Sequence, residues 1–173
     1  ASSKVVAISF SKNLNSNERM IYLETLGLGG ATKELSSPLP LGGDWGMEMA
    51  ISYDFINTSD LRRLGDHQGQ GDELSIPVLT FGKGLYYNLD FFLQFSALPM
   101  EEKFSFYSAF IRWAIYELPN SPVTLSFLFA GNSSSYSDLI SLKTTSADFI
   151  LSYYLENLSL YFGGGYARAV GMF

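Results

Sequence analysis

The sequence predicts an all-β fold, an antiparallel barrel of about eight strands that forms one domain over residues 1–173. Two observations support this prediction. The apolar residues come in short, aromatic, alternating segments rather than in long amphipathic runs. Aromatic residues make up 16% of the chain and charged residues also 16%, whereas charged residues usually make up roughly a quarter of a globular chain.

The clearest alternating segment is residues 45–55. The odd positions of this segment carry Trp45, Met47, Met49, Ile51, Tyr53 and Phe55, and the even positions carry Gly46, Glu48, Ala50, Ser52 and Asp54. A strand sends successive side chains to opposite faces, so one face is apolar and the other is small and polar. In a soluble sheet the apolar face packs on a core, whereas in a membrane barrel it faces lipid and the polar face lines the lumen.

The same alternation divides the rest of the chain into strands and breaks. Residues 20–33 contain three glycines in their second half, which favours a strand over a helix. The predicted strands are residues 20–33, 45–55, 74–81, 88–98, 103–116, 123–130, 139–155 and 158–173, with 4–11 as a ninth candidate. The predicted loops 57–73, 99–102 and 131–138 alternate with the turns 82–84, 119–122 and 156–157. Longer loops on one side are typical of outer-membrane barrels.

Four charged residues inside the predicted strands lie opposite the apolar faces. They are Glu48, Asp90, Arg112 and Asp148, and the sequence predicts that they form a polar network in the lumen. Arg112 lies between Ile111 and Trp113 of the apolar face, so period two places it on the opposite face. A lipid-facing arginine at mid-depth costs about 2–4 kcal/mol, whereas an inward one pairs with Glu48 or Asp90.

A soluble β-sandwich or lipocalin-like barrel accounts for the alternation equally well, because it has the same period of two. Three features favour the membrane class. The apolar faces are long and aromatic, aromatic residues recur at strand ends, and charges inside strands fall opposite the apolar faces. Several segments also reach about 10 residues, as tilted membrane strands do, whereas strands of soluble sheets have about 5–6 residues.

The segments IPVLTFGKGLYYNLDFFLQFSAL, FSFYSAFIRWAIYEL, PVTLSFLFAG, TTSADFILSYYL and LSLYFGGGYARA resemble bacterial outer-membrane β-barrel proteins. The resemblance covers roughly residues 20–173. Many such barrels end in an aromatic residue, as this chain does at Phe173. The resemblance implies a porin-like protein of a Gram-negative outer membrane. It also implies contact with outer-membrane lipids and lipopolysaccharide, and extracellular loops that are available to a protein partner.

The predicted loop 57–73 holds the candidate residues for chemistry: Arg62, Arg63, Asp66 and His67. His67 beside Asp66 is a candidate catalytic residue, because outer-membrane hydrolases use a histidine near the extracellular rim. The alternative is a solvated loop histidine, and no partner residue is identifiable by spacing. Arg62 and Arg63 are candidates for contact with lipopolysaccharide phosphates.

The composition excludes several other classes. The net charge is −6 and the 11 Lys and Arg residues are scattered, which excludes a nucleic-acid footprint. No cysteine is present, so disulfides and thiolate zinc sites are excluded. We predict no cofactor and no metal site.

The sequence thus predicts an integral outer-membrane barrel with a structural, adhesive or partner-binding role and without catalysis. Two alternatives stay open. One is an enzyme that hydrolyses lipid or peptide through His67. The other is a channel or transporter for small or hydrophobic solutes. That alternative requires extra strands or oligomerisation, because a barrel of about eight strands is filled by its own side chains.

Overall fold

The computed structural model describes residues 14–29, 31, 39–61, 64, 73–96, 104–117, 122–136, 140–155 and 158–172. Within them, seven strands form one sheet in sequence order, and each strand is antiparallel to the next. The strands are β1 (Met47–Asn57), β2 (Glu73–Gly84), β3 (Leu89–Ser96), β4 (Phe104–Glu117), β5 (Val123–Tyr136), β6 (Ile140–Leu155) and β7 (Leu158–Met172). The all-β, antiparallel prediction is therefore confirmed.

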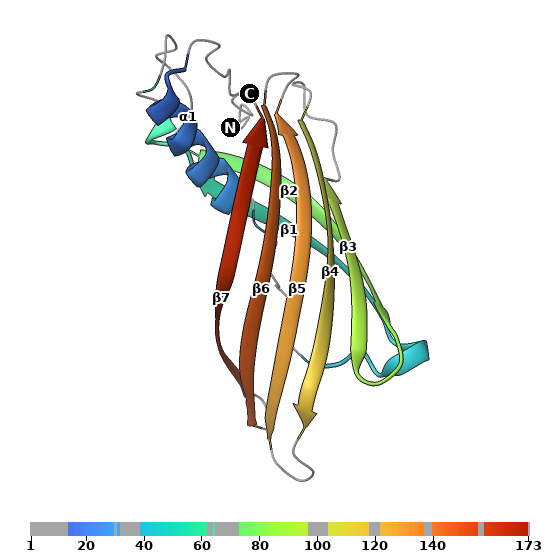
Figure 1. Cartoon of the computed structure of the whole chain (residues 1–173). Helices are drawn as coiled ribbons and strands as arrows, with labels where there is room; N and C mark the ends of the chain where they lie inside the picture. The colour runs from blue at the N-terminus through green and yellow to red at the C-terminus, as the bar shows by residue number, and fades with distance from the viewer. Residues whose placement is uncertain are drawn as a thin grey trace, which may run out of the picture.

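The sheet curls into a half-barrel that is open between β1 and β7 (Figure 1). β1 and β2 cross behind the long strands β4–β7 in this view. The expected count of about eight strands is wrong for the described residues, which contain seven. Among these residues β1 and β7 are not hydrogen-bonded to each other, so the sheet has two free edges.

The missing strand is the one expected at residues 20–33, and its first part is helical. A regular helix, α1 (Ser16–Tyr22), continues into a wider turn, η1 (Leu23–Leu28). Asn15 and Glu18 form a capping box, in which each side chain accepts a hydrogen bond from the other residue's backbone N–H, at 2.9 and 2.8 Å. The helix begins within residues 13–19, where the hydrophobic pattern alone indicates only a polar break between strands. The candidate strand 4–11 lies outside the described residues.

The helix packs on the concave face of the sheet, at the end that we call the helix end (top of Figure 1). Gly27 lies so close to β7 that an added Cβ would be 2.7 Å from the Ala169 Cβ. Thr144 of β6 donates a hydrogen bond to the Gly27 carbonyl at 3.1 Å, and Gly29 lies against Ile56 of β1. The two glycines therefore allow the helix to bridge the two sides of the opening at this end. The apolar cluster beneath it contains Leu14, Tyr22, Leu26, Leu61, Ile140 and Leu142.

A loop and a turn that the composition predicts are formed by strand residues in the structure. Residues 131–136, expected as a loop, continue β5 and pair with both β4 and β6. Their small polar side chains do not weaken the strand, because backbone groups make the ladder on both sides. The tight turn expected at residues 82–84 lies at 85–88 instead, where Tyr87 and Asn88 have positive φ angles of 56° and 57°. The opposite end of the sheet, which carries this turn, is called the turn end below.

Candidate functional site

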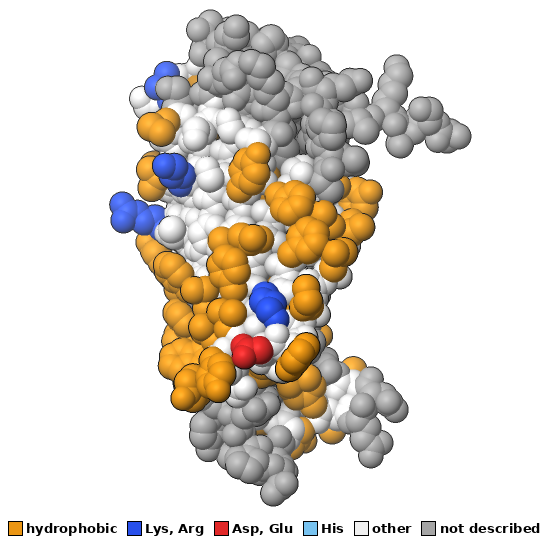
Figure 2. Space-filling model, turned by 90° about the vertical axis from the view of Figure 1, so that its right-hand side faces the viewer, with side chains coloured by type: hydrophobic (Ala, Val, Ile, Leu, Met, Phe, Trp, Pro, Cys, Tyr) orange, Lys and Arg blue, Asp and Glu red, His pale blue; other side chains and the backbone are white. Residues whose placement is uncertain are grey.

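The two faces of the sheet have opposite chemistry. The convex face exposes large apolar side chains from every strand, and Figure 2 shows hydrophobic side chains gathered across the middle and lower parts of one side. On β1 the exposed residues are Met47, Met49, Ile51, Tyr53 and Phe55, and on β7 they include Leu158, Leu160, Phe162, Tyr166, Val170 and Met172. The odd–even alternation predicted for residues 45–55 is the one observed on β1.

The concave face buries polar residues together with apolar ones. The polar residues with almost no exposed surface are Thr80, Asp90, Gln94, Ser108, Arg112, Thr124, Ser126, Asn132, Ser134, Thr144, Ser146 and Ser152. Soluble proteins rarely expose a continuous apolar face of this extent, and they bury charged residues only when these are paired. The molecule thus buries polar side chains beside apolar ones on the concave face and exposes mainly apolar ones on the convex face.

Asp90 and Arg112 form a buried ion pair on the concave face, near the turn end of β3. They are directly opposite each other on β3 and β4. Arg112 Nη2 lies 2.8 Å and Nε 3.1 Å from Asp90 Oδ2, and both side chains are 1% exposed. The guanidinium also lies over the Phe92 ring, 4.8 Å from its centroid, and Phe92 stacks on Phe110 at 4.4 Å. The carboxylate and the ring together replace the water that a buried guanidinium has lost.

Asp90 also binds the segment that precedes β1. The backbone N–H of Leu41 donates to both carboxylate oxygens of Asp90, at 3.2 Å each. The Leu41 side chain packs against the apolar cluster of Phe92, Phe110, Leu128 and Ala130. Leu41 and Gly43 therefore lie against the concave face, and the Asp90 carboxylate holds Leu41 there.

Glu48 and Asp148 do not join this pair. Both are half-buried and face glycines on the neighbouring strands, Gly82 and Gly165 respectively. Neither forms an ion pair with any residue that the structure describes. Asp148 lies in the same row across the sheet as Arg112, but Leu128 of β5 separates them.

The predicted four-residue set is therefore joined only at Asp90 and Arg112. Alternation assigns a side chain to a face but does not fix which residues lie opposite each other on neighbouring strands. The loop candidates Arg62, Arg63, Asp66 and His67 lie outside the described residues.

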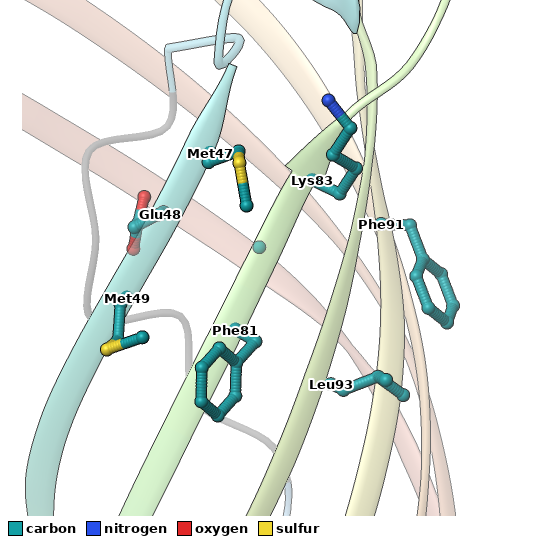
Figure 3. Close-up of a pocket in the computed structure, with 8 residues that line it drawn as sticks. Met47, Glu48, Met49, Phe81, Lys83, Phe91 and Leu93 are labelled. Carbon is teal, nitrogen blue, oxygen red and sulfur yellow. The ribbon is translucent and has the colours of Figure 1, made fainter. Parts of the chain in front are cut away.

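A groove on the convex face was not predicted from the sequence. It has a volume of about 390 Å³ and runs over β1, β2 and β3. Its lining residues are Met47, Glu48, Met49, Phe81, Gly82, Lys83, Phe91 and Leu93 (Figure 3). Lys83 was assigned to a tight turn, so its place on the convex face was missed. The alternation from Leu79 through Phe81, continued by one step, would have found it.

The described part of the chain contains neither of two further features. No group of three or more His, Cys, Asp or Glu residues there is arranged to hold a metal ion. Among the described helices none is long and apolar enough to cross a membrane.

Comparison with known proteins gives no relative. No family model, no curated protein and no solved structure matches the chain.

Proposed function

We propose that this protein is an integral β-barrel protein of a Gram-negative outer membrane, with a structural, adhesive or partner-binding role. The observation that carries the proposal is an exposed apolar convex face opposite a concave face that buries polar and charged side chains together with apolar ones. Apolar residues cover the convex face, and the concave face buries Arg112, Asp90 and a set of hydroxyl and amide side chains. Membrane barrels have this distribution, because lipid surrounds them and polar groups line the interior.

The strand lengths agree with this proposal. β4, β5, β6 and β7 have 14, 14, 16 and 15 residues. A tilted strand needs about 9–11 residues to cross the hydrocarbon core. On β6 the exposed residues change from Lys143 and Thr145 near the helix end to Phe149 and Leu151 further along. This change is the one expected where a strand passes from a polar zone into lipid.

The filled concave face supports a role without solute conduction. The ion pair, Leu41 and the helix occupy space that an open pore would need. A barrel of about eight strands is filled by its own side chains in any case. We therefore expect no steady conductance in planar bilayers. The enzyme alternative rests on His67 alone, and the His67→Ala variant with a phospholipid-turnover assay tests it.

The proposed membrane function requires hydrogen-bond partners for the free edges of β1 and β7. Backbone groups at an open sheet edge are intolerable in lipid, so both edges need partners in the membrane. In an antiparallel meander of seven strands, the first and last strands run in the same direction. A strand that completes the sheet in antiparallel fashion therefore runs from the helix end to the turn end.

The proposal is tested by refolding the protein with and without detergent micelles and comparing gel migration of heated and unheated samples. We expect a folded species only with detergent, and a shift in migration after heating. A monodisperse, folded protein in detergent-free buffer contradicts the proposal.

A further inference from the structure

One cation lies among the apolar side chains of the convex face near the turn end. Lys83 of β2 follows Leu79 and Phe81 on this face, and it is flanked across the sheet by Met47 and Phe91. It is half-buried. A lysine on the lipid-facing side is costly at mid-membrane but costs little near the surface. Its position therefore needs an explanation from its depth and surroundings.

The residues near Lys83 indicate its depth. Trp45, Tyr86 and Tyr87 are also at the turn end, with exposed fractions of 95%, 68% and 85%. Tryptophan and tyrosine gather at the level of the lipid headgroups, because their rings are apolar and their polar atoms stay hydrated. Lys83 lies two residues before the turn that carries both tyrosines. When the sheet spans a bilayer, the Lys83 ammonium is at headgroup level.

The groove continues from Lys83 toward the middle of the sheet. In the next row Met49, Phe81 and Leu93 lie side by side on β1, β2 and β3. In Figure 3 the Lys83 side chain extends away from Phe81 and Leu93, so its charge is at one end of the apolar channel. The volume of about 390 Å³ is in the range of small-ligand sites, about 300–1,000 Å³. Methionine side chains line the β1 side of the groove, and they adapt readily to a flexible ligand.

The Lys83 ammonium is also held in place. It donates a hydrogen bond to the backbone carbonyl of Asp44. An ammonium has three N–H donors, so two remain for a further acceptor. A fixed ammonium at the end of an apolar channel matches a phosphate group joined to an acyl chain.

We propose that this groove binds one anionic phospholipid. The lipid phosphate contacts the Lys83 ammonium, and the first part of an acyl chain lies along Met49, Phe81 and Leu93. This inference rests on the proposed membrane function and adds a specific lipid site to it. It separates the groove from the rest of the convex face, which contacts lipid without selecting headgroups.

The test uses Trp45 as a reporter in a Trp113→Phe background, because the chain has only these two tryptophans. The protein is reconstituted in phosphatidylcholine vesicles that contain either brominated phosphatidylglycerol or brominated phosphatidylcholine, and quenching of Trp45 is measured. We expect phosphatidylglycerol to quench at roughly fivefold lower mole fraction, which is the enrichment that one surface lysine provides. Lys83→Gln should abolish the difference and Lys83→Arg should keep it.

Lys143→Gln is the matched control, because Lys143 is exposed on the same convex face but belongs to the polar end of β6. It should leave the preference unchanged. Equal quenching by both lipids in the inserted wild-type protein overturns the lipid site and leaves the membrane function standing. Equal loss of preference in the Lys143 and Lys83 variants also overturns the site, because the attraction is then unspecific. A protein that does not insert at all overturns both proposals.

Discussion

The convex face of β6 and the concave face between β3 and β4 differ in the exposure and in the pairing of their side chains. Phe149, Leu151 and Tyr153 of β6 are exposed in the described part of the chain, and the proposed membrane function requires an apolar medium around them. Asp90 and Arg112 have almost no access to solvent, and each neutralises the charge of the other. If the proposed membrane function holds, surrounding lipid stabilises the convex face, whereas specific pairing stabilises the concave face. We therefore expect substitutions on the two faces to change stability for different physical reasons.

The largest effect is expected on the paired face. Arg112→Leu leaves the Asp90 carboxylate buried without its cation, so we expect the free energy of unfolding to fall by about 3–5 kcal/mol. The double variant Arg112→Leu, Asp90→Asn should recover part of this loss, because the second change removes the unpaired charge. Denaturant titration of the micelle-bound protein measures both values.

Glu48→Gln is the matched control for that recovery. Glu48 is a half-buried carboxylate on the same face, but it does not pair with Arg112 in the structure. We expect Glu48→Gln to recover nothing in the Arg112→Leu background. Recovery by Glu48→Gln equal to that by Asp90→Asn would show that the carboxylates act through their summed charge, not through the 2.8 Å contact.

The next effect concerns the convex face of β6. Leu151→Arg places a charge in the apolar zone of β6, and we expect a loss of about 2–4 kcal/mol in stability measured in lipid vesicles. Thr145→Arg changes an exposed residue on the same strand and the same face, but in the polar zone, and should cost about 0–1 kcal/mol. In a water-soluble protein both changes would stay within about 0.5 kcal/mol, since both sites are exposed. Equal losses of stability in the two variants would show that the polar and apolar zones of β6 do not differ in their surroundings.

A smaller effect concerns the helix that bridges the opening. Gly27→Val forces a side chain against Ala169, and overpacking of this kind costs about 1–3 kcal/mol. Gly131→Val on β5 is the control, because nothing described lies within 4 Å of its added Cβ. We expect the Gly27 variant to expose Arg19 to trypsin sooner than the control does. Identical cleavage rates would mean that the helix does not depend on close approach to β7.

The smallest effect is at the start of α1. Asn15→Ala removes the side chain that accepts from the Glu18 N–H, and loss of such a cap costs about 1 kcal/mol. Asn15→Asp should preserve most of the stability, because aspartate caps equally well. The thermal midpoint of the three proteins distinguishes these outcomes. A variant Asn15→Ala as stable as wild type would show that packing alone fixes the helix.

Period-two alternation predicted most of the sheet, because the faces of a strand depend on its own sequence. It placed Arg112 opposite Ile111 and Trp113, and it divided β1 correctly. It failed at α1 and η1, because the glycines of residues 20–33 were taken as evidence for a strand, whereas Gly27 allows close contact with Ala169 and Gly29 with Ile56. It also could not find the groove, because that site depends on which residues of β1, β2 and β3 lie side by side. Register across strands is a property of the folded sheet, and local pattern does not encode it.

Vesicle flotation measures whether the convex face contacts lipid. The protein is folded in the presence of phospholipid vesicles, washed with urea to remove surface-bound protein, and centrifuged in a density gradient. We predict that the wild-type protein floats with the vesicles after the wash. Complete release by urea, with a folded monomer at the bottom of the gradient, would contradict the account.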